Sequence, residues 1–387
     1  MRTIGVVTTS RADYGIYQPV LRAIVAEPNL RLKLFVTGMH LSPEFGLTVR
    51  TIEEDGFPIA ERVESLLSSD SPAGIATSMG LGVQGFAMAF GRTRPDLLLV
   101  LGDRFEMHAA ALAALPFKIP VAHLHGGEVT RGAIDESLRH SLTKLSHLHF
   151  VTTDEYRRRV VRLGEEPWRV TVSGAPSLDN LRDIRLLSRD QFRSRFGIDL
   201  QPETLLITYH PVTLEYERTG EQVENLLAGL GQTGRPLLFT QANADTYGRE
   251  VNSRIREFVA LNSQAGVVDN LGTQGYFSAM SLAAAMVGNS SSGIIEAASF
   301  GLPVVNIGNR QQGRMHGRNV IDTGYSRDAI LAGIRQATDP EFRRTLEGIV
   351  NPYGEGRAAP LIVARLKEVP LDDNLLLKAF FDGEAAS

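Results

Sequence analysis

Several short apolar runs in this sequence end in side chains that can move protons or bind anions. The run Leu97–Leu101 is followed at once by Gly102, Asp103 and Arg104. The structural alternative is an aspartate that caps a helix, with an arginine in its first turn. We favour a functional role, because a buried strand here delivers a carboxylate and a guanidinium side by side.

A second cluster contains histidines and acids. Alternation along a strand places His123 and His125 on the same side, whereas Asp135 and Arg139, four residues apart, share one helical face. Two histidines with Glu128 could suggest zinc, but their spacing across a Gly-Gly turn matches no metal-hydrolase pattern. We therefore predict acids and imidazoles that transfer protons, and no metal.

The second half of the chain offers groups that could bind a nucleotide. His210 precedes a proline, which fixes it in an extended conformation, although a buried histidine bonded to backbone would look the same. Asn243 follows another apolar run and has an amide that could contact a ribose or a base. This second signal is weak.

The segment 288–298 is the strongest local pattern. An apolar run enters a turn with Ser290 and Ser291, and Glu296 follows in the next helix. Hydroxyl and N–H groups at a helix N-terminus bind a diphosphate, while a carboxylate can accept from both ribose hydroxyls. A helix-capping box is the structural alternative, but it requires fewer serines than this turn contains. Arg310 adds a cation after the next run, and Arg11 follows the first run of the chain, where a helix cap with a surface arginine is equally compatible.

Short β-branched and aliphatic runs alternate with helical stretches along the whole chain, which predicts parallel sheets covered by helices. We expect an α/β protein with two doubly wound, Rossmann-like domains that face each other across a cleft. The predicted domains are residues 1–175 and 190–360, with a boundary near 175–200. A C-terminal helical segment, 365–387, is expected to pack back on the first domain. Walker and dinucleotide fingerprints are absent from the sequence.

Composition excludes several classes of protein. The 40 basic against 44 acidic residues give a net charge of −4, which argues against a nucleic-acid-binding protein. With no cysteine, thiolate metal sites and cysteine nucleophiles are excluded. The uninterrupted apolar runs are too short to span a bilayer, and the start of the chain does not resemble a signal peptide. We expect a cytoplasmic protein that does not bind membranes.

Taken in order, these residues resemble the hydrolysing UDP-N-acetylglucosamine 2-epimerases of sialic-acid-type sugar synthesis, a family similar to the GT-B group of nucleotide-sugar enzymes. The resemblance extends from Arg11 to about Asn319. Six ordered motifs carry it: Ser10–Gly15, Thr37–Leu41, Gly102–Glu106, His125–Glu128, His210–Pro211 and Asn289–Ser291.

The resemblance implies roles for individual residues. Those that match positions holding the UDP part are Arg11, Arg104, His210, Asn243, Ser290, Ser291, Glu296 and Arg310. Leu271 and Gly272 match a loop that lies against the uracil, and the acid-base region is matched by Asp103, Asp135 and Arg139. Many relatives carry a glutamate where this chain has His125, so either His125 or Glu128 could substitute for it. His125 is the better positional match.

The family chemistry implied is elimination of UDP to a glycal followed by hydration, without metal or nicotinamide cofactor. UDP-N-acetylglucosamine is our first choice of substrate, and UDP-N,N'-diacetylbacillosamine, of legionaminic-acid synthesis, is the alternative. A non-hydrolysing epimerase, a GT-B glycosyltransferase and a non-catalytic UDP-sugar sensor remain as rivals. The acid cluster of Asp103 and Asp135 argues against a glycosyltransferase, and it would have no purpose in a non-catalytic sensor. The resemblance also implies a homo-oligomer, either a dimer or a tetramer.

Overall fold

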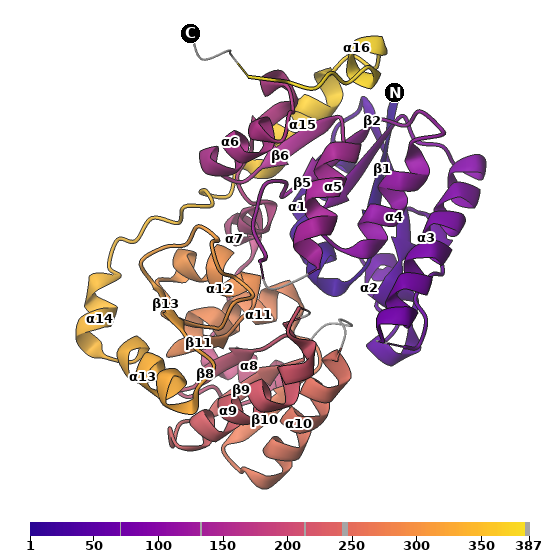
Figure 1. Cartoon of the computed structure of the whole chain (residues 1–387). Coiled ribbons are helices and arrows are strands. Elements are labelled where there is room, and N and C mark those ends of the chain that lie inside the picture. Colours follow the sequence, from indigo (N-terminus) through magenta and orange to yellow (C-terminus); the bar gives the residue numbers. More distant parts are fainter. Residues whose placement is uncertain (70, 132–133, 213, 242–246, 384–387) are drawn as a thin grey trace. The chain divides into compact units, whose positions relative to one another are not determined.

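The computed structural model describes residues 1–69, 71–131, 134–212, 214–241 and 247–383, which form two compact units (Figure 1). The first unit contains residues 1–128, 135–182 and 353–387. The second contains residues 129–134 and 183–352. Each unit contains one parallel sheet.

The sheet of the first unit has seven strands in the order β3-β2-β1-β4-β5-β6-β7. The order reverses between β1 and β4, so right-handed crossovers place helices on both faces. The strands are β1 (Arg2–Thr8), β2 (Leu30–Thr37), β3 (Ile59–Val63), β4 (Leu97–Leu101), β5 (Val121–Leu124), β6 (Leu148–Val151) and β7 (Val170–Val172).

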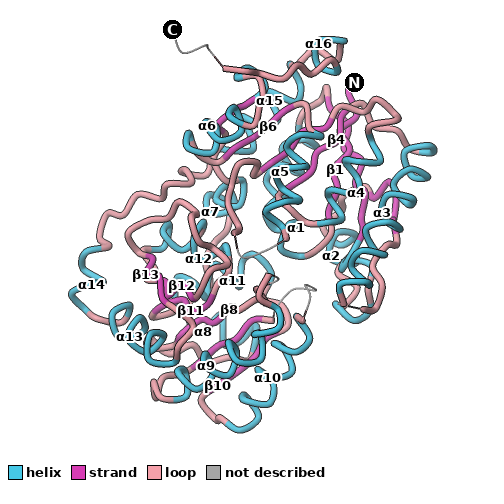
Figure 2. The backbone as a smooth tube through the Cα atoms, in the orientation of Figure 1, coloured by secondary structure: helices cyan, strands magenta, loops and turns pink. Residues whose placement is uncertain are grey.

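The helices of this unit connect the strands and cover the sheet (Figure 2). They are α1 (Arg11–Ala26), α2 (Val49–Glu54), α3 (Pro72–Arg92), α4 (Phe105–Ala114), α5 (Asp135–Leu145), α6 (Asp154–Arg162), α7 (Asn180–Asp183), α15 (Ala358–Glu368) and α16 (Asp373–Leu376). The central strand β4 is fully buried along its whole length, which explains its unbroken Leu-Val sequence.

The sheet of the second unit has six strands in the equivalent order β10-β9-β8-β11-β12-β13. Its strands are β8 (Leu205–Thr208), β9 (Leu237–Thr240), β10 (Ala265–Val268), β11 (Ala285–Gly288), β12 (Val304–Ile307) and β13 (Val320–Thr323). Its helices are α8 (Arg189–Phe196), α9 (Thr219–Gly231), α10 (Gly248–Leu261), α11 (Gly272–Leu282), α12 (Ser291–Ile295), α13 (Arg327–Ala337) and α14 (Pro340–Thr345). The prediction of two doubly wound domains is confirmed.

Short 3₁₀ helices complete the described secondary structure. They are Gly38–Leu41, Pro43–Phe45, Pro167–Arg169, Pro176–Asp179, Tyr216–Arg218 and Ala297–Phe300.

One strand at the edge of each sheet was absent from the sequence prediction. β3 contains Glu61 and Arg62, and β13 contains Asp322. Both strands lie at a sheet edge and are mostly half-buried. An edge strand needs fewer apolar side chains than a central one, so its pattern is weak.

The C-terminal segment belongs to the first unit from residue 353 onward, whereas the predicted second domain extended to residue 360. The segment forms two helices, and α15 packs against α1. The buried guanidinium of Arg169 donates to the backbone oxygens of Asn374 at 2.8 Å and Leu375 at 2.9 Å. Residues 129–131 and 134 belong to the second unit.

In the described part of the chain, α3 is the one helix long and apolar enough to cross a membrane by length and composition alone. Its apolar residues do not form an uninterrupted run in the sequence. Phe86, Ala89 and Phe90 of α3 are buried in the hydrophobic core of the first unit, and the helix packs against α4. One face of α3 is therefore part of this core.

Candidate active site

Every described residue of the predicted site follows the carboxyl end of a strand, in the connecting loop or in the helix after it. In open parallel sheets these loops form the ligand-binding edge. The residues divide between the two units. The first has Arg11, Asp103, Arg104, His125, Glu128, Asp135 and Arg139, and the second has His210, Leu271, Gly272, Ser290, Ser291, Glu296 and Arg310. Asn243 lies outside the described residues.

Asp103 forms an ion pair with Arg139. Asp103 follows β4, whereas Arg139 lies in the second turn of α5 and is almost completely buried. Asp135 is the first residue of α5, one turn before Arg139. The structure therefore brings the β4 loop and α5 together, as expected for one acid-base region.

Arg104 is the residue before α4 and binds the carboxylate of Glu106 through Nε at 3.2 Å and Nη2 at 3.3 Å. Glu106 is buried, and desolvation raises its pKa, although the charge of Arg104 opposes this. A Cβ atom on Gly38 would lie 2.7 Å from Glu106 Oε1, so only glycine fits beside this carboxylate. Glu106 is the last residue of the motif Gly102–Glu106, and its contact with Arg104 was not predicted from the sequence.

The motif Ser10–Gly15 contains a buried carboxylate that serves the local structure. Asp13 accepts hydrogen bonds from the hydroxyls of Thr8 at 2.5 Å and Thr9 at 2.6 Å, and from the N–H of Ser10 at 2.8 Å. These bonds fix the turn between β1 and α1. Arg11, the first residue of α1, is thereby held at the carboxyl end of β1.

His125 and Glu128 form a buried pair directly after β5. His125 Nδ1 lies 2.7 Å from Glu128 Oε1, and Thr152 Oγ1 donates to the same oxygen at 3.2 Å. His123 has a different role, since its Nε2 lies 2.7 Å from the carbonyl oxygen of Gly102. Burial lowers the pKa of His123 to about 3, so it is a neutral donor to that carbonyl.

In the second unit, the loops after β8 and β11 are joined through Asn289. Its side chain accepts from the N–H of His210 at 2.7 Å and donates to the His210 carbonyl at 2.8 Å. The carbonyl oxygen of Asn289 accepts from Arg310 Nη1 at 3.2 Å and from Gln311 Nε2 at 2.8 Å. Three predicted loops, those of His210, Ser290 and Arg310, therefore meet at Asn289.

The serine turn differs in one respect from expectation. Ser290 caps α12, accepting from the N–H of Ser292 at 3.3 Å, and Ser291 is the first residue of that helix. α12 has only five residues, and Glu296 is its buried C-cap. A helix this short has a small dipole, so anion binding here depends on the hydroxyl and N–H groups themselves.

A group of hydroxyls beside the serine turn was missed from the sequence. Thr208 Oγ1 lies 2.7 Å from Thr240 Oγ1 and 3.4 Å from the hydroxyl of Tyr276. Burial raises the pKa of Tyr276, and its hydroxyl also interacts with Ser292 and Ser290. Thr208 and Thr240 are the last residues of β8 and β9, which was the only signal for them.

Leu271 is the buried N-cap of α11, and Gly272 begins that helix with φ +61°.

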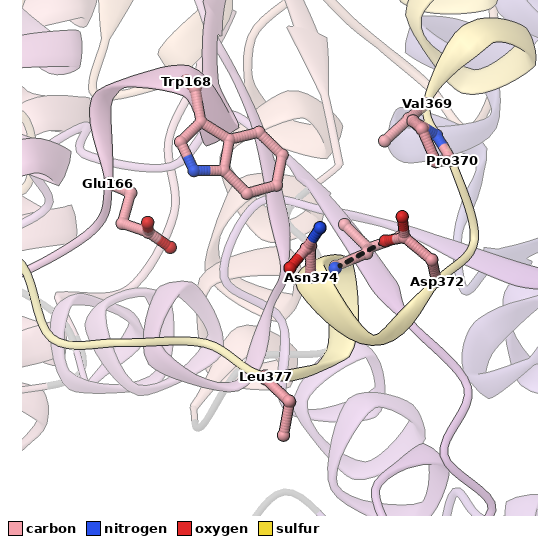
Figure 3. Close-up of a pocket in the computed structure, with 8 residues that line it drawn as sticks. Glu166, Trp168, Val369, Pro370, Asp372, Asn374 and Leu377 are labelled. Atoms are coloured by element: carbon pink, nitrogen blue, oxygen red, sulfur yellow. Dashed lines mark hydrogen bonds between the residues drawn. The ribbon is translucent and has the colours of Figure 1, made fainter.

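No group of three or more His, Asp or Glu side chains suited to a metal ion exists among the described residues. A shallow cavity of about 420 Å³ lies instead in the first unit, beside α16 (Figure 3). It is lined by Trp168 and Leu377 among others, and by none of the predicted site residues.

Comparison with known proteins decides the family. The family model described as UDP-N-acetylglucosamine 2-epimerase matches residues 22–367. The chain belongs to the UDP-N-acetylglucosamine 2-epimerase family. It is therefore an enzyme that acts on a UDP-sugar, and the resemblance seen in the sequence is confirmed.

Relatives of this epimerase are similar over most of their length. The GDP/UDP-N,N'-diacetylbacillosamine 2-epimerase (hydrolyzing) of Campylobacter jejuni is 41% identical, covering 83% of this chain and 84% of that protein. The UDP-N,N'-diacetylbacillosamine 2-epimerase (hydrolyzing) of Legionella pneumophila is 37% identical, covering 98% and 99%. The UDP-GlcNAc 2-epimerase of Neisseria meningitidis bound to UDP-GlcNAc has a TM-score of 0.81 at 20% identity, covering 95% of this chain and all of that one. This last likeness shows the shared GT-B-like fold.

Proposed function

We propose that this epimerase is a hydrolysing enzyme, which releases UDP and a free sugar inverted at C2. The observation that carries the proposal is the meeting of acid-base groups after β4 and β5, where Asp103 pairs with Arg139 and His125 with Glu128. A C2 proton beside an acetamido group is barely acidic, so its removal needs a placed base of this kind.

The reaction has two steps. In the first, a base takes the C2 proton, the C2–H electron pair forms a C1=C2 double bond, and the C1–O bond breaks with its electrons leaving on UDP. In the second, water adds its oxygen to C1 of the glycal, and C2 receives a proton on the opposite face. The catalytic pool is Asp103, His125, Glu128, Asp135 and Arg139.

The second unit supplies most of the proposed nucleotide contacts. Ser290, Ser291 and Arg310 suit the diphosphate, whose negative charge grows as it leaves. Glu296 suits the ribose hydroxyls, and the Leu271–Gly272 loop suits the uracil. His210 and Asn243 complete this set in the second unit. The family resemblance assigns UDP contacts to Arg11 and Arg104 as well. Hydrogen bonds through Asn289 support the proposal, since they already fix the loops of His210 and Arg310.

Two UDP-sugars are candidate substrates for the proposed reaction. UDP-N,N'-diacetylbacillosamine is favoured by the names of the relatives at 41% and 37% identity. UDP-N-acetylglucosamine, the first choice from the sequence, is favoured by the description of the family model. The two sugars differ at C4 and C6, so a site that binds a hydroxyl at those positions would strongly reject the deoxy sugar.

The test is incubation with each UDP-sugar in deuterated water containing a chelator, followed by proton NMR. We expect free UDP and a free 2-epimeric sugar with deuterium at C2 from one of the two. An epimer still attached to UDP would indicate the non-hydrolysing reaction. Two intact substrates would contradict the proposal and favour a glycosyltransferase, which needs an acceptor.

We also propose that the enzyme is a cytoplasmic homo-oligomer, a dimer or tetramer, which acts without a membrane or nucleic-acid partner. Closed symmetric association is the usual state of soluble enzymes. Light scattering of the purified protein and fractionation of cells test these two points separately.

A further inference from the structure

His125 has an unusual backbone conformation for its residue type. Its φ is +64°, in the left-handed region that few residues other than glycine adopt. Its N–H donates to the carbonyl oxygen of Phe150 at 3.0 Å, which ties the residue to the end of β6. Such a conformation is energetically unfavourable, and conformations of this kind cluster at functional sites.

The side chain of His125 is oriented by Glu128. Glu128 Oε1 accepts from the Thr152 hydroxyl and lies 2.7 Å from His125 Nδ1. A carboxylate oxygen only accepts, so Nδ1 carries the proton. In the neutral imidazole, Nε2 then holds the free electron pair.

That second nitrogen has no partner within the part of the chain that the structure describes. His125 is 5% exposed, and its Nε2 is buried without a hydrogen bond. A buried polar atom without a hydrogen bond is energetically unfavourable, so a ligand atom that supplies the missing partner is favoured.

His125 and Asp103 follow the ends of two neighbouring strands, β5 and β4, at the same level of the sheet. Leu101 of β4 pairs in register with Leu124 of β5, and the N–H of Gly102 donates to the Leu124 carbonyl at 2.9 Å. His125 is the next residue after Leu124, and Asp103 is the second after Leu101. Both residues therefore follow the same rung of the sheet.

We propose that Glu128 is a positioning residue, which holds His125 in its Nδ1-protonated form so that Nε2 exchanges a proton with C2 of the sugar. This inference rests on the proposed function. In the elimination, the new Nε2–H bond forms as C2–H breaks, and the carboxylate of Glu128 stabilises the resulting imidazolium. The imidazolium later loses its proton to solvent, while a different group protonates C2 on the other face.

The first test is the tautomer of His125 itself, measured by ¹⁵N NMR in the wild-type enzyme. We expect a protonated Nδ1 and an unprotonated Nε2, with this preference lost in Glu128→Gln. A protonated Nε2 in the wild type would overturn the proposal. Because this measurement needs no turnover, it stays informative if the proposed reaction fails in the NMR assay.

The second test is kinetic. Glu128→Gln is expected to lower kcat by about 10²–10⁴-fold with little change in KM, as loss of an orienting carboxylate does elsewhere. In a His125→Ala background the same change should have almost no further effect on kcat. Additive losses, or an unchanged kcat in Glu128→Gln, would contradict the positioning role. Thr152→Val is the matched control, since it removes a hydrogen bond to Glu128 but keeps the carboxylate, and a loss of about tenfold or less is expected.

Discussion

The side chain of Asn289 binds both backbone groups of His210, with hydrogen bonds of 2.7 Å and 2.8 Å. Its own carbonyl oxygen accepts from Arg310 and Gln311. The buried side-chain amide of Asn289 thus joins the loops after β8 and β11, and its backbone carbonyl binds the loop after the neighbouring strand β12. The proposed nucleotide contacts depend on this amide for their geometry, although none of them is Asn289 itself.

Asn289→Ala is expected to weaken UDP binding about tenfold or more and to cost about 1–3 kcal/mol of unfolding free energy, because the backbone of His210 loses its buried partners. Calorimetric titration with UDP and urea unfolding measure the two effects. Asn319→Ala is the matched control, since Asn319 is also buried and donates to a carbonyl, that of Leu302 at 2.9 Å. An equal loss of UDP affinity in both variants would contradict a specific role for Asn289.

Gly288→Ala should destabilise the second unit severely. Gly288 has φ +142°, and a Cβ atom there would lie 2.0 Å from the carbonyl oxygen of Thr208. Strands β8 and β11 would have to separate, which we expect to cost about 1–3 kcal/mol or more. The melting temperature measures this, with Gly266→Ala as the control because a Cβ atom at Gly266 meets nothing within 4 Å. A native melting temperature in Gly288→Ala would show that the strands tolerate the methyl group.

Asp103→Asn removes the charge that pairs with Arg139 while keeping the size of the side chain. The change should lower turnover about 10²-fold or more and leave UDP affinity nearly intact, because the charge acts on the sugar. Steady-state kinetics and UDP titration separate these effects. Asp154→Asn, at an exposed position that begins α6, controls for the loss of one charge. Wild-type turnover in Asp103→Asn would remove this carboxylate from the mechanism.

His123 predicts how stability changes with pH. Desolvation lowers its pKa from the ordinary 6.5 to about 3, so between these values the unfolded chain binds a proton that the folded chain does not. Above pH 6.5, His123 is neutral in both states and does not lower the free energy of unfolding. As pH falls from 6.5 toward 3, the free energy of unfolding decreases by about 1.4 kcal/mol per pH unit because of His123.

Urea unfolding between pH 6.5 and pH 5 tests this for the wild type and for His123→Gln, which keeps a donor for the carbonyl of Gly102. The variant should lose less stability over this range. Other buried histidines, such as His147, whose pKa burial lowers to about 4, titrate equally in both proteins. Parallel pH curves would contradict the effect assigned to His123.

Much of the fold follows from local pattern. The fully buried run Leu97–Leu101 coincides with β4 as predicted. Prediction failed for the edge strands β3 and β13, where half-burial permits charged residues.

For the candidate site, the sequence by itself determined which residue types follow each strand, because a strand, its turn and the next helix are consecutive in the chain. Only the tertiary structure decided which of these side chains bind one another. The pairs Asp103–Arg139 and Asn289–His210 join segments whose contacts depend on packing and on the register of neighbouring strands. Packing also brought Thr208 to Tyr276. Hydrogen bonding between side chains is decided by three-dimensional position, whereas residue type sets only what each group is able to donate or accept.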